Sequence, residues 1–381
     1  MDSGTLPEVR PVRPLARGRL ALVLQGGGAL GAYQAGVYQA LHEAGLEPDE
    51  VASVSIGGIN GAIIAGNRPD RRLDRLREFW ETVTARQMWL CAPDGDEPRK
   101  ARNAWSSTLT MLFGQPGFFT PQLPNPWLSL RGSRTATSFY DSAPLRETLL
   151  RVVDFDVLNQ RTIRYACGAV NVLNGNFAYF DSARQEILPE HVMASGALPP
   201  ALPMVRIGTD AYWDGGIVSN TPLQYVLEAM QSAETLIFQV DLFSARGPLP
   251  RDMYDVLARQ KDIQYSSRTR LVTDYFRERR RTNLLLRRVL DKLPDEQLDD
   301  EERAAKRRLA SMPGVTILQL IYQQTAYEDQ ARDYEFSSTS MREHWDAGRR
   351  DTERTLRHKE WLAMPPDEGG IIVHDVHRLD D

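Results

Sequence analysis

The strongest constraint on the fold is a strand–loop–helix pattern that occurs twice near the start of the chain. Leu20–Leu24 (LALVL) is a continuous apolar run, which is typical of a strand buried on both faces of a parallel sheet. Ala32–Ala44 follows with helical spacing, and Gly45 is a suitable C-cap. Val51–Val54 and Gly57–Ala65 then repeat the order of strand and helix. Two such units in close succession predict an α/β fold with a mostly parallel sheet.

The later part of the chain continues this pattern less regularly. Apolar runs predict four more strands, over residues 163–172, 176–180, 235–241 and 315–321, with an NG hairpin turn between the first two. Helices are predicted over residues 69–90 and 144–153, and long charged helices after about residue 245. Residues 91–142 are rich in Pro, Gly and Ser, so we expect an irregular insert there.

The composition is that of a globular protein and excludes several classes. Hydrophobic residues make up 42% of the 381, which is enough for a sizeable core. The net charge of −5 argues against nucleic acid as a partner. Cys91 and Cys167, the two cysteines, have neither CxxC nor metal-ligand spacing, so no disulfide framework and no metal site are predicted.

The N-terminal residues indicate a soluble, cytoplasmic protein. Residues 1–17 contain Pro and Arg but no apolar signal-peptide run, so we predict a disordered arm. Leu20–Leu41 is the longest uncharged run, but its GGG and its glutamines favour a strand–loop–helix over a membrane span.

A serine lies at the second strand-to-helix turn. The order Ser53-Val54-Ser55-Ile56-Gly57 resembles the nucleophile elbow G-x-S-x-G, with serine in place of the first glycine. The N–H groups and dipole at the start of the following helix would favour negative charge developing near the Ser55 hydroxyl. The alternative is an ordinary turn with a capping serine.

A glycine-rich loop follows the first strand. Gly26–Gly31 (GGGALG) matches the dinucleotide-binding pattern G-x-G-x-x-G. That fingerprint expects an acidic residue at the end of the second strand, but Glu47, Asp49 and Glu50 all lie before that strand. The loop also lacks the Gly-Lys-Ser/Thr of a phosphate-binding loop. Its exposed N–H groups therefore favour binding of an oxyanion.

A serine nucleophile needs a base, and the chain offers two candidates. Among the histidines only His191 precedes a suggestive small-residue stretch, while His344 and His358 are expected on the surface of late polar helices. Asp214, followed by Gly215 and Gly216, could present its carboxylate to a cleft without obstruction. The alternative for Asp214 is a D-G hairpin turn.

Taken together, these motifs resemble the patatin-like phospholipases. That family has a GGGxxG loop after the first strand, a G-x-S-x-G elbow and a distant D-G-G/A motif, which correspond here to Gly26–Gly31, Ser53–Gly57 and Asp214–Gly216. Asn220 and Pro222 match the family's N-x-P ending. The resemblance implies a three-layer α/β/α fold with a mostly parallel central sheet, together with a largely helical C-terminal region found in some bacterial members.

The resemblance also implies a mechanism. Asp214 would accept the proton of Ser55, and the N–H groups of Gly26, Gly27 and Gly28 would stabilise the oxyanion of an acyl transfer reaction. Gly31, Ser53, Gly57, Gly215 and Gly216 would support the loops, and no metal or organic cofactor is needed. Two departures are the serine at position 53 and Leu30, which stands where many members have Arg or Lys.

The expected division of the chain has three parts. Residues 1–17 form the arm, residues 18–243 the catalytic domain with the insert at about 91–142, and residues 244–381 a mainly helical accessory region. The substrate would be a lipid ester, as for a phospholipase A or lysophospholipase. The alternatives are an esterase for short-chain or hydroxyalkanoate oligomer esters and a non-catalytic binding or scaffold protein; a Rossmann oxidoreductase is a more distant alternative.

Two segments are candidates for transient contact with a membrane surface. Trp105–Phe119 could line an acyl-chain pocket, dip into lipid, or simply pack on the core. Arg277–Arg281 (RERRR), with Arg287 and Arg288, lies in an amphipathic stretch that could touch anionic head groups, or could be a solvated helix face.

Overall fold

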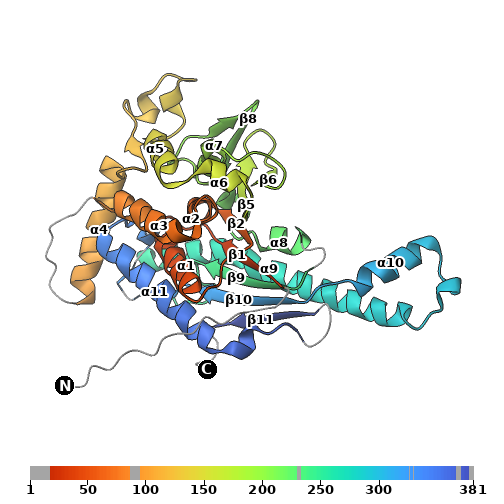
Figure 1. Ribbon diagram of the computed structural model, residues 1–381. Helices are drawn as coiled ribbons and strands as arrows, with labels where there is room; N and C mark the ends of the chain where they lie inside the picture. Colours follow the sequence, from red (N-terminus) through yellow and green to blue (C-terminus); the bar gives the residue numbers. More distant parts are fainter. Residues whose placement is uncertain are drawn as a thin grey trace, which may run out of the picture.

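The computed structural model describes residues 18–85, 95–229, 233–325, 327–328, 330–365 and 370–376. The predicted arm at residues 1–17 and Cys91 lie outside these residues. Within them, nine strands form one mixed sheet in the order β11-β10-β9-β1-β2-β5-β8-β7, with β6 paired to β5 (Figure 1). The strands are β1 Arg19–Leu24, β2 Glu50–Val54, β5 Arg164–Asn171, β6 Phe177–Asp181, β7 Val205–Ile207, β8 Asp210–Asp214, β9 Thr235–Asp241, β10 Val315–Ile321 and β11 Ile371–Asp375.

The sheet is parallel over most of its width. Strands β11, β10, β9, β1, β2 and β5 all run in one direction. The antiparallel part begins at β5, which pairs with β6 and β8, and β8 pairs with β7. The structure therefore confirms the predicted mostly parallel α/β fold.

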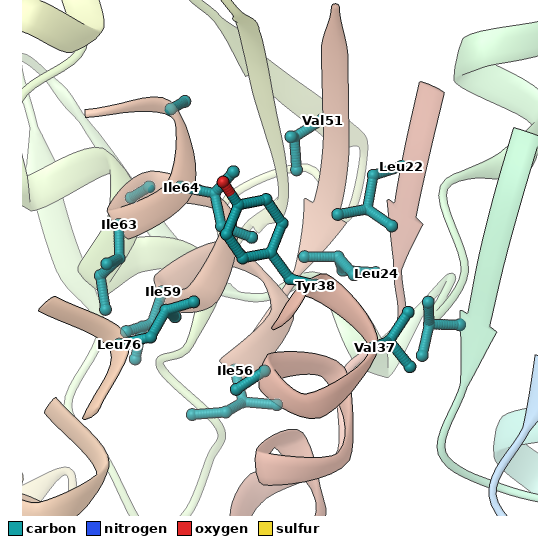
Figure 2. Close-up of a cluster of buried hydrophobic side chains, with 14 of the residues drawn as sticks. Leu22, Leu24, Val37, Tyr38, Val51, Ile56, Ile59, Ile63, Ile64 and Leu76 are labelled. Atoms are coloured by element: carbon teal, nitrogen blue, oxygen red, sulfur yellow. The ribbon is translucent and has the colours of Figure 1, made fainter. Parts of the chain in front are cut away.

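A thick layer of helices covers one face of the sheet. It contains α1 Ala32–Glu43, α2 Ile56–Ala65, α3 Pro69–Val83, α5 Ala143–Val152, α6 Phe155–Asn159, α7 Pro189–Ser195 and α11 Ser338–Arg357. Figure 2 shows part of this core, where Leu22 and Leu24 of β1 face Tyr38 of α1 and Ile59 of α2. Because side chains alternate along a strand, the even-numbered residues of β1 enter this layer.

A thinner layer covers the other face. Ala21 and Val23 of β1 pack there with residues of α8 (Leu223–Ala229) and α9 (Met253–Leu290), including Phe276. Helix α9 is 38 residues long, and its distal half forms a hairpin with α10 (Asp300–Ala310) that extends away from the sheet (Figure 1). Burial on both faces explains why β1 is a continuous apolar run.

Residues 91–142 differ from their prediction. An 18-residue helix, α4 (Asp96–Phe113), occupies part of the segment that was expected to be irregular. The Gly and Pro residues that suggested a loop gather after Phe113, where the short strands β3 (Thr120–Pro121) and β4 (Tyr140–Asp141) pair antiparallel. Asp96 and Glu97 lie in the first turn of α4, where carboxylates favour a helix.

The C-terminal third combines helices with two strands of the main sheet. Strands β10 and β11 extend the sheet beyond β9, and α11 packs on α1. The domain boundary at residue 243 stays a prediction. Among the described residues, no helix has both the length and the apolar character needed to cross a bilayer.

Candidate active site

Ser55 lies at a sharp turn between β2 and α2. Its backbone has φ 57° and ψ −126°, a strained conformation for a residue with a side chain. The N–H of Ser55 donates to the hydroxyl of Ser195 at 3.0 Å, and that hydroxyl donates to the carbonyl of Gly168 at 2.7 Å. Two neighbouring elements, α7 and β5, therefore hold the turn in place.

The register of β5 explains why Ser55 and Asp214 meet. Val54, the last residue of β2, pairs with Gly168 of β5, while Asp214, the last residue of β8, pairs with Ala169. Strand β6 pairs with both of these β5 residues, so β2 and β8 share the opposite edge of β5 and approach each other end to end. Ser55 and Asp214 are therefore brought together because Val54 and Asp214 pair with adjacent residues of β5.

Asp214 is buried and hydrogen-bonded. Asp214 is only 2% exposed, and its Oδ1 atom accepts a hydrogen bond from the N–H of Gly216 at 2.7 Å. Burial raises the pKa of Asp214 to about 7, although hydrogen bonds from the Ser55 side chain and from Gly216 favour its ionised form. A carboxylate with this pKa can accept a proton near neutral pH.

The serine at position 53 fits the elbow without disrupting it. Its hydroxyl is buried and donates to the carbonyl of Ala166 in β5 at 2.9 Å. The elbow's remaining glycine is Gly57, where an added Cβ would lie 2.6 Å from the carbonyl oxygen of Leu24. The close approach of α2 to β1 therefore requires glycine at position 57 and accepts serine at position 53.

The glycine loop lies between β1 and the 3₁₀ turn η1 (Gly28–Gly31) and borders the same cavity as Ser55. The N–H of Gly26 already donates to the carbonyl of Asn220 at 3.3 Å, and the Asn220 amide donates to the carbonyl of Gly26 at 3.0 Å. Within the described residues, the N–H groups of Gly27 and Gly28 have no such partner. Of the three N–H groups expected to bind an oxyanion, that of Gly26 is thus engaged within the fold.

The other predicted supporting residues lie close by. Gly31 ends η1, and its carbonyl accepts the amide of Asn60 at 2.9 Å. Gly215 and Gly216 begin the short turn η4 (Gly215–Ile217) directly after Asp214, so Asp214 is a strand end and not the turn of a hairpin.

A largely apolar cavity of about 300 Å³ opens over Ser55 and Asp214. The insert contributes side chains from α4 and from the β3–β4 region, and the C-terminal third contributes residues of α9 and of the turn η6 (Arg332–Tyr334). These two groups are Thr110, Met111, Phe118, Phe119, Phe139 and Tyr140 from the insert, and Tyr265, Asp333, Tyr334 and Phe336 from the C-terminal third. Such a cavity accommodates an apolar ligand whose reacting group reaches Ser55.

The sequence model of the patatin-like phospholipase family matches residues 22–227, more than half of the chain. This chain belongs to the patatin-like phospholipase family. A second family model, described as patatin phospholipase, matches residues 263–368, so the C-terminal region also resembles known members.

Curated relatives of this patatin-like protein are much longer. Lysophospholipase NTE1 of Lodderomyces elongisporus is 22% identical over 251 residues, which cover 66% of this chain and 14% of the relative. Human patatin-like phospholipase domain-containing protein 6 is 43% identical over 77 residues, which cover 20% of this chain and 6% of the relative. The chain therefore matches only a small part of each of these proteins.

Solved structures with low overall similarity include VipD from Legionella pneumophila and the type III effector protein ExoU. VipD has a TM-score of 0.35 and 13% identity, with coverage of 87% of this chain and 68% of VipD. ExoU has a TM-score of 0.31 and 14% identity, with coverage of 92% of this chain and 55% of ExoU.

In this patatin-like protein, the histidine considered as an alternative base lies outside the cavity lining. The Nδ1 atom of His191 accepts the N–H of Leu188 at 2.8 Å at the start of α7, and its ring packs against Phe180. Burial lowers the pKa of His191. His344 was expected at the surface but is buried and bonds to Glu328 at 2.6 Å, so that expectation was wrong.

Several residues of the patatin-like site were not predicted from the sequence. The side chain of Gln25, just before the glycine loop, accepts the N–H groups of Leu242 and Phe243 and donates to Thr221. Ser195 lies in the small-residue stretch that was noticed, but its bond to Ser55 could not be inferred from it. The cavity residues of the C-terminal third carry no local signal, because more than 200 positions separate them from Ser55.

Proposed function

We propose that this chain hydrolyses carboxylic esters of lipids, with Ser55 as nucleophile and Asp214 as general base. The observation that carries the proposal is the Ser55 hydroxyl, held on a strained elbow in the lining of an apolar cavity, beside the buried carboxyl of Asp214, whose ionised form it favours. A nucleophile and base within hydrogen-bonding reach are the minimum apparatus for acyl transfer.

The acylation step follows from these positions. Asp214 takes the proton of Ser55 as Oγ attacks the ester carbonyl carbon, and the N–H groups of Gly27 and Gly28 stabilise the oxyanion. The tetrahedral intermediate then breaks its bond to the leaving oxygen, which takes the proton back from Asp214. The products of this step are the released alcohol and an acyl-Ser55 ester.

Water completes the cycle. Asp214, ionised again, accepts a proton from a water molecule that attacks the acyl-Ser55 carbonyl. The same donors stabilise the second oxyanion, and its collapse releases the carboxylic acid and restores Ser55. Each oxyanion donor is worth about 3–4 kcal/mol, so the loop contributes strongly to the rate.

The apolar cavity and the names of matched relatives support a lipid as the ester. Aromatic and aliphatic side chains line most of the cavity, which suits an acyl chain. Matched relatives are named lysophospholipases, although this chain corresponds to 14% of the length of the first of them. A lysophospholipid or phospholipid ester is accordingly the first substrate class to test.

Active-site labelling and a substrate panel test the proposal. A fluorophosphonate probe should label the wild-type protein at Ser55 and leave Ser55→Ala unlabelled. Asp214→Asn should react at least about a hundredfold more slowly, since it removes the general base. The panel contains lysophospholipids, diacyl phospholipids, p-nitrophenyl esters of increasing chain length and hydroxybutyrate oligomers.

Matched controls separate the alternatives. His191→Ala should keep most of the activity; a large loss there, in a variant that remains folded, would indicate that histidine is the base. Preference for short-chain or hydroxybutyrate esters would replace lipids as the substrate class. A folded wild-type protein that neither reacts with the probe nor hydrolyses any ester would favour a binding or scaffold role.

A further inference from the structure

A short segment of the insert projects from the body of the molecule. Its base is the β3–β4 pair, and the projection comprises residues 122–139, seen as the gold turns at the top of Figure 1. The N–H of Gln122 donates to the carbonyl of Phe139 at 2.9 Å, and the Gln122 amide donates to the hydroxyl of Ser138 at 2.6 Å. These bonds close the base of the projection and fix its direction.

Large apolar side chains cover the tip of the projection. Leu123, Trp127, Leu128 and Leu130 are 86%, 85%, 82% and 85% exposed. The turn that carries them is held by its own hydrogen bonds, such as that from the N–H of Trp127 to the side chain of Asn125 at 3.1 Å. Four large apolar side chains this exposed in one short segment mark an interaction surface, whereas isolated ones would need no explanation.

The charge pattern around this segment is one-sided. The chain has 51 acidic residues, yet none lies between Pro98 and Tyr140. The projection itself carries Arg131 and Arg134, which are both exposed and form no ion pair within the described part of the chain. The projection therefore combines exposed apolar side chains with two positive charges and contains no carboxylate.

This surface is continuous with the walls of the cavity. Phe139 and Tyr140, at the base of the projection, line the cavity, and the Tyr140 hydroxyl donates to the carbonyl of Met111 at 2.6 Å. Beside it, the end of α4 exposes Met111, Leu112 and Phe113 at 51%, 62% and 59%. The exposed apolar surface thus runs from the tip of the projection to residues that contact the cavity.

We propose that residues 122–139, together with the end of α4, dock the protein on an anionic phospholipid surface. Exposed Trp and Leu side chains gain free energy by entering the acyl region, and arginines beside them gain by pairing with lipid phosphates. The absence of carboxylates removes the repulsion that an anionic surface would otherwise exert. The purpose of docking rests on the proposed lipid hydrolysis, because the docked cavity would face the bilayer from which its substrate comes.

The sequence offered a rival surface, and the fold separates the two. Arg277–Arg281 lies in the distal half of α9, in the hairpin with α10 that extends away from the projection (Figure 1). Arg280 donates to the carbonyl of Pro313 at 2.8 Å and is partly buried there. Exposed leucines of the same helix, Leu285 and Leu286 at 49% and 44%, supply a matched control.

Vesicle binding tests the proposal apart from catalysis. Full-length protein carrying Ser55→Ala is co-sedimented with vesicles of phosphatidylcholine alone or mixed with phosphatidylglycerol. The triple variant Trp127→Ser, Leu128→Ser, Leu130→Ser should bind the mixed vesicles at least about tenfold more weakly. Arg131→Gln with Arg134→Gln should remove most of the preference for phosphatidylglycerol. Leu285→Ser with Leu286→Ser should bind like its parent.

Three outcomes would contradict the proposed docking surface. It is wrong if the parent binds neither vesicle, if the triple variant binds unchanged, or if the α9 control loses binding equally. A parent that is dimeric without vesicles and a triple variant that is monomeric would make the patch a self-association surface instead. With Ser55 intact, the triple variant should hydrolyse soluble p-nitrophenyl butyrate normally. A wild-type protein that binds vesicles but does not hydrolyse p-nitrophenyl butyrate would contradict only the proposed function.

Discussion

At the residue scale, the pKa of Asp214 sets the pH at which the proposed base is ready. Burial raises that pKa to about 7, so a growing fraction of Asp214 is protonated as the pH falls below 7. A protonated Asp214 cannot accept the Ser55 proton. We therefore expect kcat/KM for p-nitrophenyl butyrate to rise with pH to a plateau above 7 and to fall by about tenfold per unit well below it.

A second buried carboxyl provides the control for this profile. Burial also raises the pKa of Asp241 to about 7, and Asp241 lies at the end of β9, where it accepts hydrogen bonds from Thr221 and Gln239. Asp241→Asn should leave the midpoint of the kcat/KM profile near 7. If the step in that profile disappears in Asp241→Asn, the profile does not report the ionisation of Asp214.

The serine at position 53 gives a second prediction at this scale. Its hydroxyl bonds to the carbonyl of Ala166, so Ser53→Ala should lower the free energy of unfolding by about 1 kcal/mol. Because the hydroxyl points into β5 and not into the cavity, the labelling rate of Ser55 should stay within about twofold of wild type. Chemical denaturation and fluorophosphonate kinetics measure the two effects. A labelling rate that collapses in a stably folded Ser53→Ala would assign the hydroxyl to catalysis.

Motif order predicted part of the site, and pairing geometry supplied the rest. Ser55, Asp214 and the glycine loop could be named from the sequence, since each sits at a turn with a recognisable local pattern. Ser195, Gln25 and the burial of His344 could not, because each depends on partners far away in the sequence. The hydrogen bond from the N–H of Gly26 could not be predicted either, because its acceptor, the carbonyl of Asn220, lies far away in the sequence.

At the scale of elements, the turn η6 braces the glycine loop from the C-terminal third. An added Cβ at Gly28, whose φ is +56°, would lie 2.2 Å from the carbonyl oxygen of Asp333. Lys261 of α9 holds η6 through Asp333 at 2.7 Å and through the carbonyl of Gln330 at 2.9 Å. The position of the proposed oxyanion donors therefore depends on α9.

Lys261→Met should weaken catalysis more than folding. It keeps most of the side-chain stem but removes the two Lys261 bonds to Asp333 and Gln330 beside the glycine loop, so kcat/KM for p-nitrophenyl butyrate should fall by about tenfold. Lys261→Arg should restore part of the loss. Arg251→Met, which removes an exposed ion pair to Asp255 near the start of the same helix, should change little. A Lys261→Met protein with a lower melting temperature and unchanged kcat/KM would reduce the lysine to a structural role.

The elements themselves were predictable where burial is complete on both faces. Strands β9 and β10 have the predicted boundaries, because a parallel strand covered on both faces is mostly apolar along its length. Helix α4 was missed because the glycines and prolines after Phe113 dominated the composition of the whole insert. Lining a pocket was one of the three roles expected for Trp105–Phe119, and residues of this segment do line the cavity.

At the scale of the whole molecule, the C-terminal third also joins the rest through strand pairing and through helix packing, besides the contact of η6 with the glycine loop. Strand β10 pairs along the full length of β9. On the helical face, α11 packs against α1, where Trp345 donates to Gln39 at 2.6 Å and Tyr33 donates to Asp351 at 2.9 Å. Both contacts bury surface that a catalytic domain ending at residue 243 would expose to water.

Truncation after residue 243 should therefore fail to give a working enzyme, although the sequence predicts a domain boundary there. The fragment would leave β9 as an open, apolar sheet edge, which promotes aggregation, and would lack Tyr265, Tyr334 and Phe336 of the cavity wall. We expect an aggregated or poorly cooperative fragment without fluorophosphonate labelling, measured beside the full chain by size-exclusion chromatography and thermal unfolding. A monomeric fragment 18–243 that unfolds cooperatively and labels at Ser55 would instead establish residues 18–243 as an autonomous catalytic domain, and the C-terminal third as an addition to it.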